Sequence, residues 1–485
     1  MFKDLILNNS IPKYIQIYNY LKLQINEGLL PKGSKLPSSR EASELFGVSR
    51  SSIISVYEML EADNLVYTVK GKGTYISDAP HKINKDWNIQ WSSYLNEASK
   101  LSEELDIIKK EIPAKKNFIS FNSIAPAPEL FDIAEFKRAF LNRLSIEEGK
   151  ILNYGYAQGY KPLIEYLYSY MEQKGVSTKN KSILITNGFT EAFDLLLSAV
   201  TNPGDSIICE NPTHNTAIKI MKVHKLNIIG VDIDRQGINL STLKRILDKF
   251  KIKAGYIIPS YHNPTGLVMD SEKRKRLYNI CKSYNVPIIE DGFCEELLYS
   301  ASHLPPLASF MGNGNGVIYT GSFSKILFPG LRIGWIFGDA QLIDTLESVK
   351  RSRNIHTSSL DQALLFEYIQ SGSFEKYIKK AKKYYKNKYE LAMTLANKYI
   401  PNEYILGNGG LHIFIKLKNI NSRHLLAKCY EKGVIFLPGD IFFTDASGYD
   451  TLRIGISRVT EENMEKGFKI IGKTLKDLSS EKNLL

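Results

Sequence analysis

From residue 117 onward, short apolar runs rich in β-branched residues alternate with helical stretches, and this alternation constrains the fold more than any other feature. The runs are SILIT (182–186), SIICE (206–210), LNIIGVDI (226–233), AGYIIPS (254–260), VPIIEDG (286–292) and GVIYTGS (316–322). Apolar runs without polar alternation are typical of strands buried on both faces of a parallel sheet. The sequence therefore predicts an α/β domain whose ligands bind at the carboxyl ends of its strands.

Polar side chains follow several of these runs. Asn263 lies in YHNPTG, and Asp291 follows PIIE. Ser322 and Lys325 follow VIYTG. Carboxyl ends of parallel strands meet at one edge of a sheet, so we expect these side chains to converge. A lysine for a Schiff base, an aspartate for a pyridinium nitrogen and an asparagine for a ring oxygen are what pyridoxal phosphate requires.

A phosphate site is predicted beside them. Gly188 and Thr190 follow SILIT at the start of a helix, where free backbone N–H groups bind phosphate. Arg332 can add a bidentate clamp to the same phosphate. The chain contains no dinucleotide fingerprint and no Walker A sequence, and GNGNG at 312–316 precedes a strand, which indicates a turn.

The N-terminal part has a different pattern. Apolar spacing predicts a helix over residues 12–28. Ser38 followed by Glu41 forms a capping box for a second helix, which Gly47 ends. Ser49 is a good N-cap for a third helix. Two short helices joined by a glycine-containing turn are typical of a helix-turn-helix, whose second helix enters the major groove of DNA.

A hairpin follows these helices. LVYTVKGKGTYIS alternates into two strands around a Lys-Gly-Lys-Gly turn, and the glycines permit a tight hairpin. The two turn lysines suit the phosphate backbone, as in the wing of a winged helix. The expected DNA contacts are Arg40, Ser49, Arg50, Ser51, Ser52, Lys70 and Lys72.

Composition sets the domain organisation and the compartment. We expect a DNA-binding domain at 1–78, a polar linker at 79–116 and a large domain at 117–485. Net charge is +12, but residues 1–78 hold nine basic and eight acidic residues, so DNA binding depends on where charges lie. Four scattered cysteines, no signal-peptide pattern and no long apolar run predict a cytoplasmic protein without a metal site or membrane span.

Two resemblances cover most of the chain. PKYIQIYNYL, LPSSREASELFGVSR and KGKGTYI resemble the GntR-type winged helix. NGFTEAFDLL, ENPTHNTA, YHNPTG, IIEDGF, SFSKILFPGLRIGW, PGDIFF and LRIGI occur in the order seen in fold-type I, class I aminotransferases. The whole chain therefore resembles a MocR-type regulator of the GntR superfamily, in which an aminotransferase-like domain senses a ligand and controls the DNA-binding head.

The resemblance implies specific roles. Lys325 matches the lysine that carries the internal aldimine, and Arg453 matches the arginine that holds a substrate α-carboxylate. Tyr154 matches a tyrosine that reaches the phosphate of the partner subunit. The implied cofactor contacts are Lys325, Asp291, Asn263, Gly188, Phe189, Thr190, His214, Ser322, Arg332 and Tyr154.

Two positions depart from the aminotransferase pattern. His214 stands where the family usually has an aromatic ring, most often tyrosine, stacked on the pyridine. Phe293 stands where a tyrosine usually donates to the cofactor's 3-oxygen, and phenylalanine cannot donate. Because that hydrogen bond tunes the pKa of the lysine adduct, Phe293 weighs against efficient transamination more than against cofactor binding.

Three functions follow from these patterns. The first is a transcriptional regulator that senses pyridoxal phosphate, an amino compound, or both, through Lys325. The second is an aminotransferase in which the DNA-binding domain is secondary. The third is a sensor of pyridoxal phosphate alone, against which Arg453 argues. The resemblance also implies a head-to-tail, domain-swapped homodimer, a double-stranded DNA operator with paired half-sites, and a small amino-compound effector.

Overall fold

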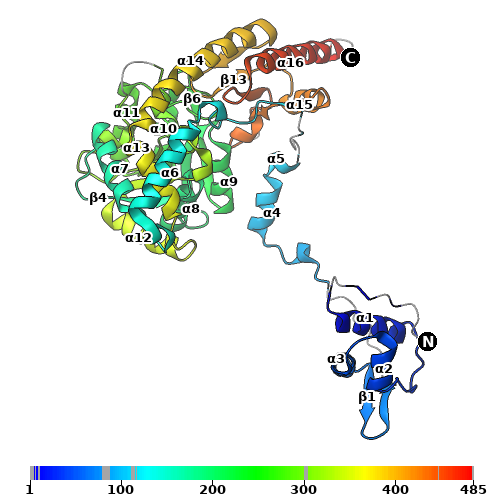
Figure 1. Ribbon diagram of the computed structural model, residues 1–485. Helices are drawn as coiled ribbons and strands as arrows, with labels where there is room; N and C mark the ends of the chain where they lie inside the picture. The colour runs from blue at the N-terminus through cyan, green and yellow to red at the C-terminus, as the bar shows by residue number, and fades with distance from the viewer. Residues whose placement is uncertain are drawn as a thin grey trace. The chain divides into compact units, whose positions relative to one another are not determined.

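The computed structural model describes residues 5, 7–8, 11–78, 88–110, 115, 117–299, 304–445 and 447–482. It divides into two compact units, Met1–Leu95 and Asn96–Leu485 (Figure 1). Of the predicted linker, residues 79–87, 111–114 and 116 lie outside the described residues. Its described part holds three short helices, η1 (Trp91–Ser93), α4 (Glu97–Glu104) and α5 (Ile107–Lys110). Helix α4 belongs to the second unit, where Glu97 pairs with Lys225 at 2.8 Å.

The first unit is a winged helix. Its elements are α1 (Lys13–Asn26), α2 (Ser39–Phe46), α3 (Arg50–Ala62), β1 (Val66–Val69) and β2 (Gly73–Ile76). The strands pair antiparallel in a two-stranded wing. One apolar cluster from all three helices and the wing forms the core.

Local signals explain where these helices begin and end. Ser38 accepts from the backbone N–H of Glu41 while the Glu41 carboxylate accepts from the N–H of Ser38, so the predicted capping box is present. Gly47 adopts a left-handed conformation with φ of 60° and ends α2. Ser49 caps α3 by accepting from the N–H of Ser52. Each predicted helix of the DNA-binding motif is therefore confirmed.

The second unit is built on an eight-stranded sheet with the order β4-β11-β10-β9-β8-β5-β6-β7. The bounds are β4 (Lys181–Thr186), β5 (Ser206–Asn211), β6 (Asn227–Asp234), β7 (Gly237–Ile238), β8 (Ile252–Ile257), β9 (Ile288–Asp291), β10 (Val317–Ser322) and β11 (Gly334–Asp339). Strands β10, β9, β8, β5 and β6 are parallel neighbours. Because β11 runs antiparallel to both β4 and β10, β4 points the same way as the rest.

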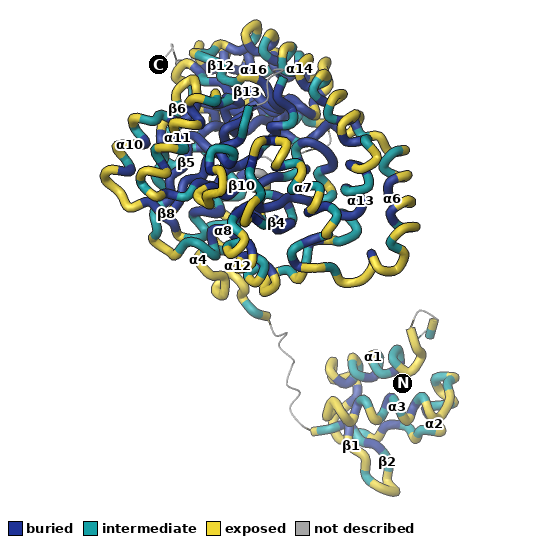
Figure 2. Tube along the Cα trace, turned by 90° about the vertical axis from the view of Figure 1, so that its left-hand side faces the viewer, coloured by how far each residue is buried: buried dark blue, intermediate teal, exposed yellow. Residues whose placement is uncertain are grey.

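Helices cover both faces of this sheet, so its strands are buried on both sides (Figure 2). Ile183 and Ile185 face one cluster while Leu184 between them faces the other. After α4 and α5, the α-helices of the unit are α6 (Ile133–Glu147), α7 (Lys161–Gln173), α8 (Phe189–Val200), α9 (Asn215–Val223), α10 (Leu240–Lys249), α11 (Ser271–Ser283), α12 (Ala340–Arg351), α13 (Ser359–Gln370), α14 (Ser373–Tyr399), α15 (Ser422–Glu431) and α16 (Glu461–Lys482). Helices α8, α9 and α12 cover one face, and α7, α10, α11 and α13 cover the other.

A smaller subdomain completes the second unit. Its sheet has the order β12-β13-β16-β15 and packs against α14, α15 and α16, of which α14 and α16 lie side by side (Figure 1). The bounds are β12 (Tyr404–Leu406), β13 (His412–Lys416), β15 (Leu437–Pro438) and β16 (Thr451–Gly455). A separate parallel pair joins β3 (Ile119–Ser120) to β14 (Val434–Ile435). Among the described residues, no helix is both long and apolar enough to cross a membrane.

Candidate cofactor and effector site

The carboxyl edge of the large sheet gathers the predicted site residues. Asp291 is the last residue of β9, and Ser322 is the last residue of β10. Gly188 follows β4 by two residues and is the N-cap of α8. The loop after β8 carries Asn263, and Lys325 ends the 3₁₀ helix η6 (Phe323–Lys325) directly after β10. Their convergence follows from the shared direction of these strands.

Gly188 and Arg332, two residues of the predicted phosphate site, lie together. A side chain at Gly188 would displace Arg332, because its Cβ would lie 2.7 Å from Nη2 of that residue. The guanidinium is held by hydrogen bonds from Nη1 to Ser324 Oγ at 3.0 Å and from Nη2 to the carbonyl of Asn187 at 3.1 Å. Arg332 itself has a left-handed backbone with φ of 54°, a conformation that costs about 1–3 kcal/mol outside glycine. Strain of this kind is typical of functional positions.

Other predicted phosphate contacts lie around the start of α8. Thr190 is exposed on the first turn of the helix, and among the described residues no side-chain cap bonds the N–H groups there. Ser322 accepts a hydrogen bond from the N–H of Ser324 at 3.2 Å. Free first-turn N–H groups beside a guanidinium suit an anion with several oxygens.

Asp291 is buried beside Tyr256. The Tyr256 hydroxyl donates to Oδ2 of Asp291 at 2.7 Å. Burial raises the pKa of Asp291 to about 7, although the tyrosine bond lowers it in part. A protonated ring nitrogen beside this carboxylate would supply the positive charge that favours its ionised form.

Lys325 is partly buried, and two arginines contribute positive charge near it. Burial lowers the pKa of Lys325, and the charges of Arg453 and Arg332 lower it further. Both effects favour the neutral amine, which is the form that attacks a carbonyl carbon.

His214 and Phe293, the two positions that differ from the aminotransferase pattern, each pack against another ring. His214 packs against Phe189 with ring centres 5.4 Å apart and planes tilted by 43°. Burial and the charges of Lys325 and Arg453 lower the pKa of His214 to about 3, so the imidazole is neutral. Phe293 packs against His412, with ring centres 6.4 Å apart.

Arg453 lies on β16, between β13 and β15 in the subdomain sheet, and only 4% of its surface is exposed. Nη1 donates to Oδ1 of Asn263 and Nη2 donates to the carbonyl of Asn122, both at 2.9 Å. Burial alone lowers the pKa of Arg453, because the described residues place no carboxylate beside it. A buried charge without a counter-ion is unstable unless a ligand supplies one.

The residues fit pyridoxal phosphate. Since the arginine can only donate, Asn263 accepts through Oδ1, and its buried Nδ2 has no partner among the described residues. It suits the ring 3-oxygen. Asp291 would hold the ring nitrogen, Gly188 and Arg332 the phosphate, and Lys325 the reactive carbon. When bound, the cofactor acts as an electron sink for bonds to an amino group.

Tyr154 is not brought into this site within one chain. Its ring is 81% exposed and lies edge-on to His356, with ring centres 6.0 Å apart. A role for Tyr154 at a cofactor therefore needs a second copy of the chain.

The predicted DNA contacts lie in the first unit. Arg50 opens α3 and donates from Nε to Ser39 Oγ at 3.0 Å, while Arg40 lies 3.9 Å from Glu44 on α2. Ser49 hydrogen-bonds to the hydroxyls of Ser51 and Ser52, both at 2.8 Å. These bonds pre-order the start of the recognition helix.

The wing supplies the remaining predicted contacts. Lys70 and Lys72 are exposed in the turn between β1 and β2, which Gly71 forms with φ of 77°. Two exposed lysines at a loop tip suit the DNA backbone.

Sequence reasoning missed several residues of the site. Ser324 and Asn187 position Arg332, Tyr256 bonds Asp291, and His412 lies beside Phe293. Ser324 and Asn187 lie inside sequence motifs of the aminotransferase pattern, so those motifs could have pointed to them. Tyr256 and His412 carry no local signal, because only the packing of distant strands brings them to the site.

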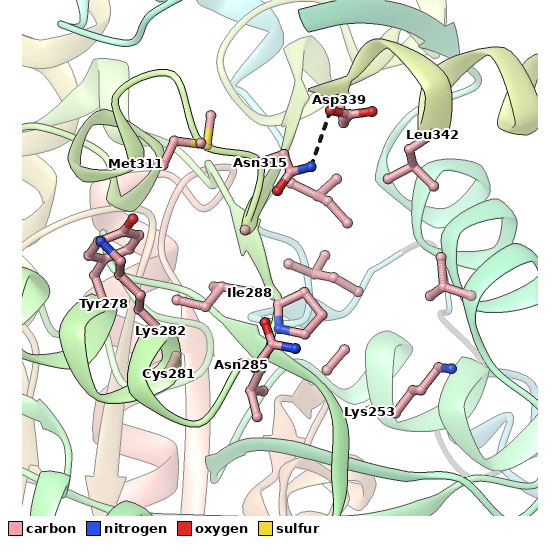
Figure 3. A pocket seen from close by; sticks show the side chains of 18 of the residues that line it. Lys253, Tyr278, Cys281, Lys282, Asn285, Ile288, Met311, Asn315, Asp339 and Leu342 are labelled. Atoms are coloured by element: carbon pink, nitrogen blue, oxygen red, sulfur yellow. Dashed lines mark hydrogen bonds between the residues drawn. The ribbon is translucent and has the colours of Figure 1, made fainter. Parts of the chain in front are cut away.

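One large cavity of the second unit lies away from these residues. A cavity of about 890 Å³ lies at the amino ends of β8, β9 and β10, lined by Lys253, Ile288 and Asn315 (Figure 3). Asn315 belongs to the GNGNG turn and donates to Asp339 at 3.3 Å. Because the predicted site residues follow the carboxyl ends of the same strands, this cavity is not their site.

Both units match models of known protein families. Residues 127–471 match the family model "Aminotransferase class I and II". The chain belongs to this family. Residues 13–76 match "Bacterial regulatory proteins, gntR family".

The proteins that this chain is similar to include regulators and aminotransferases. It is 28% identical over 483 residues to the uncharacterized HTH-type transcriptional regulator YdfD of Bacillus subtilis, covering 97% of this chain and 98% of that one. It is 32% identical over 384 residues to an uncharacterized aminotransferase of Saccharolobus solfataricus, covering 77% and 95%. The α-aminoadipate aminotransferase LysN of Thermus thermophilus, solved with N-(5'-phosphopyridoxyl)-L-leucine, superposes with a TM-score of 0.73 at 28% identity, covering 81% of this chain and 100% of that one.

These matches confirm three predictions. The fold class is a winged helix joined to an aminotransferase-like α/β domain, and the resemblance to a regulator with that architecture is confirmed. The predicted cofactor, pyridoxal phosphate, is that of the family to which the large unit belongs.

Proposed function

We propose that the protein is a MocR-type transcriptional regulator that binds pyridoxal phosphate at Lys325 and an amino-compound effector beside it. One observation carries the proposal. The same chain holds an exposed recognition helix and, in its aminotransferase-like unit, a buried guanidinium, that of Arg453, without an anion. The carboxylate of an effector would supply the missing counter-ion of Arg453. A DNA-binding protein would then have a use for this buried arginine as the place where a ligand is sensed.

The effector acts by its difference in affinity for two states of the protein. A ligand that binds one arrangement of the chain more tightly shifts the population towards it, and DNA binding shifts with it. We assign Lys325, Asp291, Asn263, Gly188, Phe189, Thr190, His214, Ser322 and Arg332 to the cofactor. Arg40, Ser49, Arg50, Ser51, Ser52, Lys70 and Lys72 are assigned to DNA.

An aminotransferase is the second candidate. The relatives that carry this name, and the setting of Lys325 that favours a neutral amine, support it. Phe293 opposes it, because its ring cannot donate a hydrogen bond to the cofactor's 3-oxygen. A sensor of pyridoxal phosphate alone has no use for the anion-free Arg453.

We further propose a homodimer that binds paired half-sites on DNA in the cytoplasm. Large apolar side chains lie exposed on α6 and the segment after it, where a monomer gains nothing from them. They include Leu141 (61% exposed), Leu152 (70%) and Tyr154. Burying this surface against a second copy gives Tyr154 access to the partner's phosphate, and two-fold symmetry gives paired half-sites. A head-to-tail, domain-swapped arrangement remains a prediction.

The visible absorption spectrum tests the proposed function. Holoprotein is mixed with each of a panel of amino acids, and its affinity for operator DNA is measured in parallel. A regulator gives a band that shifts and stays shifted, together with a change in DNA affinity. A band that decays to the pyridoxamine form and returns with a keto acid identifies an aminotransferase and overturns the regulator as the main function.

A further inference from the structure

Four buried polar atoms around Arg453 have no hydrogen-bond partner in the part of the chain that the structure describes. They are Nε of Arg453, Nδ2 of Asn263, Oδ1 of Asn122 and Nδ1 of His412. The first three belong to one bonded group, because Arg453 donates to Asn263 and to the backbone of Asn122. Buried polar atoms are normally paired, so a group of unpaired ones indicates a ligand that pairs them.

The strand register brings His412 to this group. His412 pairs with Gly455, and Phe414 pairs with Arg453, so His412 and Arg453 point to the same face of the sheet. Gly455 presents no side chain opposite His412. The ring centre of His412 also lies 6.4 Å from that of Phe293, with the planes tilted by 52°. His412 is fully buried, and its neighbours include Arg453 across the strand pair and the ring of Phe293.

The unpaired nitrogen of His412 is an acceptor. Nε2 lies 3.3 Å from the carbonyl oxygen of His262, which can only accept, so Nε2 carries the hydrogen. Burial and the charge of Arg453 lower the pKa of His412 to about 3, although the backbone carbonyls of His262 and Pro264 raise it in part, and the ring is neutral. Nδ1 therefore offers a lone pair to which no described residue donates.

We propose, resting on the proposed function, that the effector is an amino acid whose neutral side chain donates a hydrogen bond to Nδ1 of His412. Its carboxylate binds Arg453. Asn263 Nδ2 donates to the cofactor in this arrangement. His412 Nδ1 and Asn122 Oδ1 then remain for the effector's side chain, and both atoms are hydrogen-bond acceptors. A hydroxyl, with one O–H, can donate to Nδ1 of His412, and an amide, with two N–H bonds, can donate to both acceptors. A carboxylate is repelled by the two acceptors, and a hydrocarbon leaves both unpaired.

Matched pairs of amino acids test this inference with the holoprotein. Threonine and valine, asparagine and aspartate, glutamine and glutamate, and tyrosine and phenylalanine differ mainly in the side-chain donor. Binding is measured by the shift of the visible band and by calorimetry. We expect the donor member of the pair that fits the site to bind about 10- to 100-fold more tightly, since an unpaired buried acceptor weakens binding by that factor.

Variants locate the effect. His412→Phe should abolish the preference within the pair, whereas His412→Asn, whose Oδ1 can replace Nδ1, should retain most of it. His424→Phe, an exposed position on α15, is the control and should change nothing. Each variant is first shown to keep the cofactor's visible band.

The outcomes separate this inference from the function on which it rests. Tighter binding of valine, aspartate, glutamate or phenylalanine by the wild type overturns the inference, even if His412→Phe does not fold. An unchanged preference in a folded His412→Phe also overturns it. No response to any amino acid overturns both the inference and the proposed effector, whereas binding without donor preference leaves the proposed function standing.

Discussion

Replacing Gly188 by alanine should damage the phosphate site far more than it damages the fold. Gly188 has φ of 79° and ψ of −178°, so an alanine there costs about 1–3 kcal/mol in backbone strain. Its Cβ would lie 2.7 Å from Nη2 and 3.1 Å from Cζ of Arg332, so the guanidinium must move. Losing a hydrogen bond between Arg332 and the phosphate costs about 1.5–3 kcal/mol, which weakens pyridoxal phosphate about 10- to 150-fold.

Gly204→Ala is the matched control. Gly204 also has a positive φ, of 89°, but no atom lies within 4 Å of its Cβ position. Urea unfolding should show comparable losses of stability in the two variants. Titration of the apoproteins with pyridoxal phosphate, followed by visible absorption, should show weakened binding only in Gly188→Ala. Equal cofactor affinity in the two variants would refute the assignment of Gly188 and Arg332 to the phosphate.

Three further predictions concern the cofactor, the DNA and the pH dependence of stability. Lys325→Ala should lose the cofactor's visible band while its far-UV circular dichroism is unchanged; a retained band contradicts the role of Lys325. Arg50→Ala should weaken operator binding about tenfold at fixed salt, within the usual range for a groove contact, without altering the band, and an unchanged titration argues against that contact. The folded pKa of His412 lies below its unfolded value of about 6.5, so its contribution to stability is complete above that pH and is lost as pH falls. The free energy of unfolding of the wild type relative to His412→Phe should therefore drop by about 2 kcal/mol between pH 6 and 4.5, and parallel pH curves would exclude a buried neutral imidazole.

Much of the architecture was readable from local pattern. The six apolar runs marked six of the strands of the large sheet, because a strand buried on both faces tolerates little polar alternation. Ser38, Gly47 and Ser49 marked helix ends, because capping is a contact between near neighbours. Motif order and residue chemistry also indicated the cofactor. The individual site assignments remain predictions.

Contacts between distant segments were decided by the tertiary structure. Strand β11, absent from the expected strands, inserts between β4 and β10 and delivers Arg332 to Gly188. Tyr256 reaches Asp291 because β8 and β9 are neighbours, and His412 faces the same side as Arg453 because β13 pairs with β16 in one register. Local sequence specifies a strand's period and faces, whereas its partner and register depend on how all the buried faces pack together. The sequence by itself therefore determined the elements and the chemistry available, and only the packed fold decided which polar atoms of the site are left to a ligand.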